Sequence, residues 1–399
     1  MPPREECPRT NGSDEPAEVS SPHAIQTRAS RRVVSGVAAV RESASVPAVG
    51  LSRFASALSE AVGVARPLRP RPVRPGWTRR RPAFWALVAL GVVAAAAGAF
   101  LAFAGDVPGV NTVARIDANA FDEPIPVGDG PNGIAFAAGS GWVTNEGNRT
   151  VQRFDPDTGE TGSATPTQGV PTGIAGGPDG VFIATEFGSR SASSQVLEVN
   201  LDTSQVEHVC DVPSSTVGIA EGGGFVWVTV SNTGDVWRLD PTRCDHERIH
   251  LAEDADPGVI TAAGDPLQVW VGDEVAQTVY RIDTRTLDVH PFGVSGAPSG
   301  IALGSESVWI SMDRSDEVVR LDASSGQTRD RIAVDEAGCD GPRDVAVGAR
   351  GVWVGCNGSG VMVMIDPKTD EVFGTLDVRG SPGAVVADAD GDVWVSVRR

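Results

Sequence analysis

The stretch GAPSGIALGSESVWISMDRSDEVVRLDASSG, residues 296–326, decides the fold because its pattern returns along the chain. It reads as a Gly/Pro turn, a short apolar run, a second apolar run around Trp309, and a third run that ends at Asp322. The same pattern stands at 129–159 and at 340–370. A repeat of fixed period dictates the architecture, so it is the first feature to interpret.

The second apolar run of each copy carries one aromatic residue at its centre. The seven positions are Trp142, Phe182, Trp227, Trp270, Trp309, Trp353 and Trp394. Their spacings are 40, 45, 43, 39, 44 and 41 residues, an average of 42. Because Trp holds the place in six copies of seven, we expect it to pack between adjacent sheets rather than to stack on a ligand.

The third run has the period of a β-strand. In VYRID, residues 279–283, apolar and polar residues alternate. Turn residues such as DPDTG follow this run, and a weaker fourth run such as RIAV at 331–334 closes the unit. Each unit is therefore predicted to be a four-stranded antiparallel meander, and seven of them fill the 294 residues of 106–399. This pattern predicts an all-β fold, a seven-bladed β-propeller.

The two ends of the repeat region predict how the ring closes. The chain enters with a third-type strand at 113–117 and a fourth at about 123–127. It leaves with a first-type strand at 383–387 and a second at 392–397. The last blade should be closed by strands from both ends, which leaves no open sheet edge between the first and last blades.

Charge divides the chain at about residue 104. Residues 1–104 hold 14 Arg, no Lys and 7 Asp/Glu, whereas residues 105–399 hold 19 Lys/Arg and 45 Asp/Glu, a net of −26. Within the first part, residues 83–104 contain no charged residue, and a helix of that length crosses the apolar layer of about 30 Å. An Arg-rich segment precedes this run, so we expect a transmembrane helix with the N-terminus inside and the propeller outside the cell.

Two other interpretations of the apolar run stay open. It could be a buried core helix, or a cleaved signal peptide, since AFA at 102–104 has a small-x-small pattern. Signal peptides begin with a short basic segment, but 82 residues precede this run, which favours an uncleaved anchor. Residues 1–82 are rich in Pro, Ser, Ala and Arg and lack sustained periodicity, so they are predicted to form a disordered cytoplasmic tail.

The pattern GP-x-GIA … VWV-x-N … V-x-RIDP-x-TG resembles the bacterial YVTN/NHL-like propellers, a family that takes in the virginiamycin B type of streptogramin lyase. VTN at 143–145 is the nearest match to the motif that names the first group. The resemblance covers 106–399 and implies a propeller. For the lyases it implies a catalytic His just before the GI of one blade, and Glu residues after the aromatic strand that hold a metal.

The residues at the position of that His can be read off directly. They are Asn132, Thr172, Val217, Gly258, Ser299, Arg343 and Gly383. The five histidines fall in the tail or on fourth strands: His23, His208, His246, His250 and His290. Glu146 and Glu186 do follow aromatic strands, so a metal-assisted lyase or lactone hydrolase is kept as the alternative function. Without a base at the mouth, proton abstraction lacks its main participant, and we expect no catalytic residue, metal or cofactor.

Ligands of propellers usually meet the face formed by the loops before the first strand and after the second. In this chain those loops supply Asn132, Asn145, Glu146, Glu186, Asn232, Asp273, Glu274, Asp313, Arg343 and Asn357 as ligand-binding candidates. The set is polar and mostly acidic, with no nucleophile–base pair. The net charge of −26 argues against nucleic acid as a partner. DADGD at 388–392 resembles the start of a calcium loop but lacks its closing Glu, so we expect a turn.

Four cysteines lie in the repeat region. Pairing Val347 with Val352 would place Arg343 opposite Cys356, with Cys339 four residues beyond, and we predict that Cys339 and Cys356 form a disulfide. Cys210 and Cys244 are expected at different heights of their outer strands, which disfavours a bond between them.

Together these observations predict a single-pass protein of the cell membrane that displays a propeller outside the cell. Its predicted function is that of a binding or sensor module for an unknown protein or small-molecule ligand.

Overall fold

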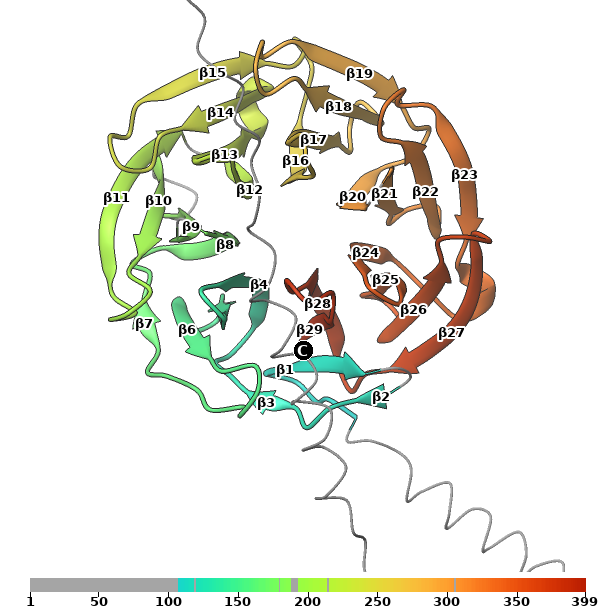
Figure 1. Cartoon of the computed structure of the whole chain (residues 1–399), viewed down its shortest axis with the longest axis horizontal. Coiled ribbons are helices and arrows are strands. Elements are labelled where there is room, and N and C mark those ends of the chain that lie inside the picture. Colours follow the sequence, from blue (N-terminus) through green and yellow to red (C-terminus); the bar gives the residue numbers. More distant parts are fainter. Residues whose placement is uncertain (1–106, 118–119, 179, 188–192, 214, 305) are drawn as a thin grey trace, which may run out of the picture. The chain divides into compact units, whose positions relative to one another are not determined.

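A computed structural model describes residues 107–399, except 118–119, 179, 188–192, 214 and 305. Within this part, antiparallel strands form seven sheets arranged around a central channel (Figure 1). The predicted seven-bladed β-propeller is therefore confirmed. The predicted tail at 1–82 and the predicted membrane helix at 83–104 lie outside the described residues. Among the residues that are described, no helix is long and apolar enough to cross a membrane.

Six blades are built from consecutive strands, and each runs from the channel to the outer rim (Figure 1). The first three are β4 (Pro131–Ala137), β5 (Ser140–Asn145), β6 (Thr150–Phe154) and β7 (Thr165–Pro166); β8 (Val170–Gly177), β9 (Gly180–Glu186), β10 (Ser193–Val199) and β11 (Val206–Pro213); and β12 (Thr216–Gly222), β13 (Phe225–Val230), β14 (Asp235–Leu239) and β15 (His246–His250). The next three are β16 (Pro257–Ala263), β17 (Gln268–Asp273), β18 (Thr278–Ile282) and β19 (Val289–Gly293); β20 (Pro298–Gly304), β21 (Ser307–Met312), β22 (Glu317–Asp322) and β23 (Thr328–Ala333); and β24 (Pro342–Gly348), β25 (Gly351–Cys356), β26 (Val361–Asp366) and β27 (Glu371–Asp377). Two short 3₁₀ turns, η1 (Ser231–Thr233) and η2 (Asp335–Ala337), lie in loops.

The seventh blade joins the two ends of the propeller. Its inner strands are β28 (Ser381–Ala387) and β29 (Val393–Arg398), and β29 pairs with β1 (Thr112–Asp117). Two short strands, β2 (Ala120–Phe121) and β3 (Ile125–Pro126), complete the outer edge by pairing with β1. The predicted closure by strands from both ends is confirmed, and the predicted fourth strand is split into these two short pieces.

The repeated aromatic residues form the core between blades. All seven are 2% exposed or less. Trp309, on β21, packs with Val345, Val352 and Val354 of the next blade. Trp142, on β5, likewise packs with Val181 of the blade that follows it. The core role expected of these residues is confirmed, and it explains the repeat, because a blade buries its faces only against its neighbours.

An Asp recurs at the end of the third strand of the repeat and stabilises the turn that follows. In the turn after β22, Asp322 Oδ1 accepts the backbone N–H groups of Ser324 and Ser325, at 3.0 and 2.8 Å. Asp155, Asp240 and Asp283 accept equivalent bonds in their blades. These side-chain turns fix the hairpin between the third and fourth strands.

Candidate functional site at the mouth of the channel

Every innermost strand carries a β-bulge near its start. The ladder to the second strand skips one residue in five blades, as between Pro131 and Gly133, and two residues in the other two, as between Thr216 and Ile219. The skipped residues include Asn132, Thr172, Val217, Gly258, Ser299, Arg343 and Gly383. A bulge re-aims a side chain away from the ladder, and all seven residues line the channel, a cavity of about 500 Å³.

The bulge also corrects one predicted register. Val347 does pair with Val352, but Cys356 lies opposite Pro342 and not opposite Arg343. The extra residue is absorbed between Pro342 and Asp344. Strict alternation cannot reveal such an insertion, so the sequence reading was wrong by one residue.

The channel changes character with depth. Beyond the bulges most side chains of its wall are apolar, and they include Ile134, Ile174, Ile219, Ile260 and Ile301, which occupy corresponding places on the first strands of five successive blades. Thr261 and Asp344 are the polar side chains that line this deeper part. A mainly apolar wall with a few polar groups is the usual composition of a small-molecule site.

A hollow of about 310 Å³ opens at the mouth. Its charged side chains come from four places: Glu146 after β5, Glu186 at the end of β9, Arg343 in the bulge of β24, and Arg398 at the end of β29. Among the described residues, no ion pair or side-chain hydrogen bond engages any of these four groups. Two acidic and two basic groups thus face one hollow without an ion-pair or hydrogen-bond partner among the described residues.

Asn132 also lines the hollow, and unlike the charged groups it is held in place. Its Nδ2 donates to the Pro171 carbonyl of the next blade at 2.9 Å. Thr144 Oγ1 donates to Asn132 Oδ1 at 2.8 Å. These bonds make Asn132 a rigid part of the wall.

Two of the ten predicted ligand-binding residues are buried. Asn145 is 0% exposed, and its Nδ2 donates to Thr150 Oγ1 at 3.3 Å. Asp273 is 0% exposed and accepts the backbone N–H groups of Asp256 and Ala276. In the structure both residues hold loops together rather than face solvent.

Four more of the predicted residues lie away from the hollow. They are Asn232, Glu274, Asp313 and Asn357. Glu274 is ion-paired with Arg314. Of the ten candidates, the structure brings Asn132, Glu146, Glu186 and Arg343 together at the mouth.

Asp344 is the channel residue that sequence reasoning missed. Its Oδ1 accepts the N–H of Val345 at 2.9 Å, and its Oδ2 accepts the N–H of Val385, in the neighbouring blade, at 2.8 Å. Burial raises the pKa of Asp344 to about 6, although the two N–H bonds and Arg343 act in the opposite direction. One signal was available: the residue after the bulge is Gly133, Gly173 or Gly300 in three other blades, so a carboxylate there is unique in the repeat.

The described residues contain two disulfides. Cys339 and Cys356 are bonded, as expected, with 5.2 Å between their Cα atoms. Cys210 and Cys244 are also bonded, with a Cα–Cα distance of 5.3 Å, so the expectation that they lie too far apart in height was wrong. Cys244 sits in the β14–β15 turn at a positive φ of 57°, and this turn returns to the outer strand of the preceding blade.

The metal shell that the lyase resemblance implies is not assembled at the mouth. Glu146 and Glu186 line the same hollow, but within the described part of the chain no third His, Cys, Asp or Glu joins them at ligand distance. The residue in the bulge of β24 is a cation, Arg343, which would oppose a bound metal ion. The donor set therefore does not fit a divalent metal at this place.

Comparison with known proteins identifies the fold. No protein-family model and no curated protein matches the chain. Virginiamycin B lyase from Staphylococcus aureus superposes with a TM-score of 0.56 at 17% identity, over 67% of this chain and 94% of that one. A streptogramin B lyase gives 0.56 at 17%, over 72% and 95%, and the WD40 propeller domain of Doa1 gives 0.57 at 9%, over 72% and 93%. At these identities the likeness establishes that the described part of this chain has the same propeller fold as the virginiamycin B lyases.

Proposed function

We propose that this chain is a binding module that holds a small ligand over the channel mouth, and that the ligand carries both a positive and a negative charge. The observation that carries the proposal is the set of four charged side chains around the hollow. Two are carboxylates and two are guanidinium groups, and none has an ion-pair partner among the described residues. A zwitterion would complement both signs at once, whereas a singly charged ligand would leave one pair without a partner.

The shape below the mouth narrows the ligand class. Below the hollow the channel wall is mostly aliphatic, with Ile in five blades and Asp344 in a sixth, so it favours an uncharged, aliphatic group on the ligand. A ligand with charged ends above and an apolar substituent below fits both zones. Amino acids with aliphatic side chains and short peptides have this character.

Mass spectrometry of the purified full-length protein tests this proposal. Ligand released by denaturation is compared between the wild type and Arg343→Gln, which removes one charge from the exposed rim. We expect a zwitterionic compound from the wild type and at least a tenfold smaller amount from the variant. Release of equal amounts from both proteins would contradict a site at the mouth.

The location of the module is a separate part of the proposal. The uncharged run at 83–104, with its Arg-rich flank, supports an anchor that leaves the propeller outside the cell, where a sensor or receptor role would be exercised. Protease added to intact cells should then digest residues 107–399 and spare the tail. Complete protection of the propeller would place it inside.

A lyase is the second candidate, favoured by the fold shared with two streptogramin lyases. The described residues at the mouth include no His, and Asp344 is the channel group whose pKa, about 6, suits a base. The test is whether the purified protein opens the ring of a streptogramin and whether Asp344→Asn loses this activity. If both are observed, the function is catalysis and not binding alone. We expect no turnover.

A further inference from the structure

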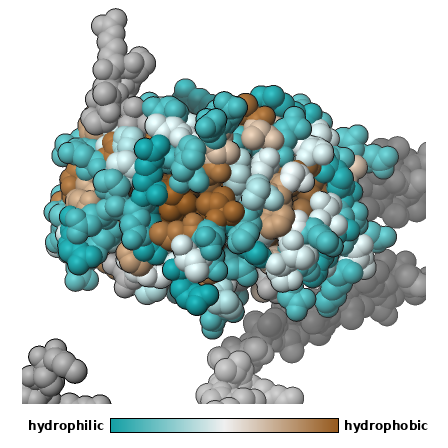
Figure 2. Space-filling model, turned by 90° about the horizontal axis from the view of Figure 1, so that it is seen from above, coloured by the Kyte–Doolittle hydropathy of each residue, from teal (hydrophilic) through white to brown (hydrophobic). Residues whose placement is uncertain are grey.

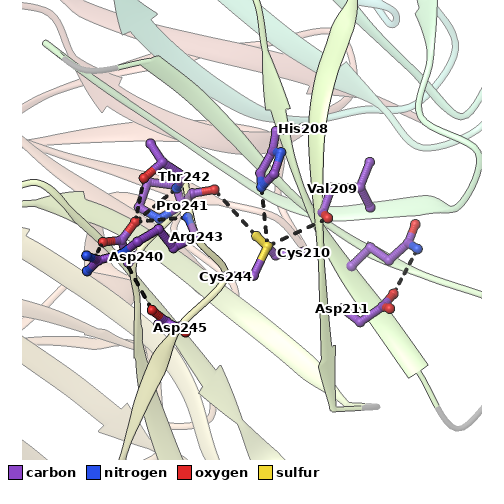
Figure 3. The surroundings of a disulfide bond; sticks show 11 residues. His208, Val209, Cys210, Asp211, Asp240, Pro241, Thr242, Arg243, Cys244 and Asp245 are labelled. Carbon is purple, nitrogen blue, oxygen red and sulfur yellow. Dashed lines mark hydrogen bonds and ion pairs between the residues drawn. A yellow bond between two sulfur atoms is a disulfide. The ribbon is translucent and has the colours of Figure 1, made fainter.

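The Cys210–Cys244 disulfide stands beside His208 (Figure 3). Cys210 and His208 belong to β11, the outermost strand of its blade, which lies at the rim away from the channel (Figure 1). His208 Nε2 is 3.3 Å from Cys244 Sγ. The imidazole nitrogen and the two sulfur atoms lie within 4.8 Å of one another. In the described residues this is the one group of three such ligands that is close enough to share a metal ion.

We propose that reduction of the Cys210–Cys244 bond creates a binding site for a soft metal ion, with His208, Cys210 and Cys244 as ligands. Two thiolates and one imidazole are the donors that Zn²⁺ and Cu⁺ prefer. The oxidised chain holds the two sulfur atoms in a covalent bond and has no such site. The same three residues therefore offer either a disulfide or a metal centre, according to the reducing power of the surroundings.

The backbone that carries these ligands does not depend on the disulfide. His208 and Cys210 are two residues apart on β11, so the strand period places them on one face, and β11 is fixed to β10 through the pair Cys210–Val196. Cys244 is fixed by its turn: its N–H donates to the Asp240 carbonyl at 2.8 Å. Both segments should keep their places when the bond is broken.

The geometry also accommodates the reduced sulfur atoms. A Cα–Cα distance of 5.3 Å allows the two side chains to rotate until both sulfur atoms reach one ion at about 2.3 Å. Cys210 Sγ has the Pro241 carbonyl at 3.5 Å, and Cys244 Sγ has the Val209 carbonyl at 3.8 Å (Figure 3). Each free thiol would have an acceptor in place before a metal arrives.

The chemical step balances with a dithiol as the reductant. Its thiolate attacks the sulfur of Cys244, the more accessible of the two, and Cys210 leaves as a thiolate. The second thiol of the reductant then closes its own disulfide, and Cys244 leaves as a thiolate. The reductant is oxidised by two electrons, and the metal ion takes the place of the protons on both sulfur atoms.

The second disulfide provides a matched control. Cys339 and Cys356 are 3% and 0% exposed, and they belong to no group of three metal ligands among the described residues. The two bonds have nearly equal Cα–Cα distances. Reduction of this second pair should create two thiols and no comparable site.

Cobalt binding tests the proposal on the full-length chain. The protein is reduced with a phosphine, freed of it without air, and titrated with Co²⁺, whose thiolate charge-transfer absorption reports the ligands. We expect one Co²⁺ per chain in the wild type and in Cys339→Ser/Cys356→Ser, and none in the oxidised protein. The affinity should fall at least about tenfold in His208→Gln, and the absorption should vanish in Cys210→Ser/Cys244→Ser, with melting curves verifying that each variant is folded.

Three results would overturn the proposal. The first is the absence of Co²⁺ binding by the reduced wild type. The second is binding by His208→Gln as tight as that of the wild type, and the third is retention of the absorption by Cys210→Ser/Cys244→Ser. Each outcome concerns residues remote from the mouth, so it leaves the proposed ligand site unaffected.

Discussion

Two positions of the repeat behave in opposite ways around the ring. The centre of the second strand is occupied by a buried aromatic residue in every blade, whereas the bulge of the first strand holds Asn, Thr, Val, Gly, Ser, Arg and Gly in turn. The first position faces a neighbouring sheet and the second faces the channel. Packing between blades requires a side chain of similar shape at the aromatic position of each blade. The bulge position faces the open channel and is not restricted by packing, so its side chains can differ and can be selected for ligand binding.

The largest loss of stability is expected where the ring of blades is broken. Deleting residues 383–399 removes β29 and most of β28, and exposes the edge of β1 and the packed face of the preceding blade. We expect loss of the cooperative melt in calorimetry. Removal of Arg399 alone, an exposed residue, is the control and should leave the transition unchanged. A cooperative melt in the longer deletion would show that the closure is dispensable.

Next in size is the loss of one core aromatic residue. Trp309→Ala should lower the free energy of unfolding by about 3–5 kcal/mol, because it opens a cavity between two blades. Val217→Ala, at an exposed bulge position, should change it by less than about 0.5 kcal/mol. Denaturant titration measures both. Similar losses from the two substitutions would erase the distinction between the positions.

Asp344 gives an intermediate and pH-dependent effect. Its pKa in the folded protein, about 6, is above the ordinary value of 3.8, so the folded state binds more protons between these values. Its contribution to stability is full below about pH 3.8 and is lost as the pH rises through 6. Asp344→Asn should therefore stabilise the protein at pH 8 by up to about 3 kcal/mol, less whatever is lost in hydrogen bonding to Val345 and Val385.

Melting of Asp344→Asn and wild type across this pH range checks the sign. The gain in stability of Asp344→Asn over the wild type should shrink steadily as the pH falls towards 4. A gain that stays constant with pH would mean that the carboxylate is not destabilised by burial.

The smallest effect on stability is expected at Arg343. This side chain is exposed and has no ion-pair partner in the described part of the propeller, so Arg343→Gln should alter the free energy of unfolding by less than about 0.5 kcal/mol. The same substitution should abolish most ligand binding. A large loss of stability would assign Arg343 to the scaffold instead.

The sequence was informative wherever an interaction is repeated. The Trp spacing and the alternation of the third strand predicted the blades, and the unequal ends predicted the closure. The register at Arg343 was wrong because a bulge leaves no mark in the alternation of residues. Cys210 and Cys244 were misjudged because their contact joins the outer strand of one blade to a turn of the next, and a comparison of heights within a single blade does not capture that geometry.

Half-buried charges were equally hard to foresee. Asp344 differs from its counterparts in other blades, but its environment depends on the neighbouring strand that supplies the N–H of Val385. Conversely, Asn145 and Asp273 look like rim residues in the sequence, and only the folded loops reveal that they are enclosed. The loops at the mouth therefore had to be seen before the four facing charges could be separated from structural polar residues.

Thermal-shift measurements with ligands of three charge classes test whether the mouth of the channel binds a zwitterion. The full-length protein and Arg343→Gln are each melted with aliphatic amino acids or dipeptides, with their N-acetylated anionic forms, and with their cationic amides. We expect the compounds with both charges to raise the melting temperature of the wild type, the singly charged forms to leave it unchanged, and Arg343→Gln to respond to none of them. An equal response of Arg343→Gln, or no response of the wild type to any class, would contradict this expectation.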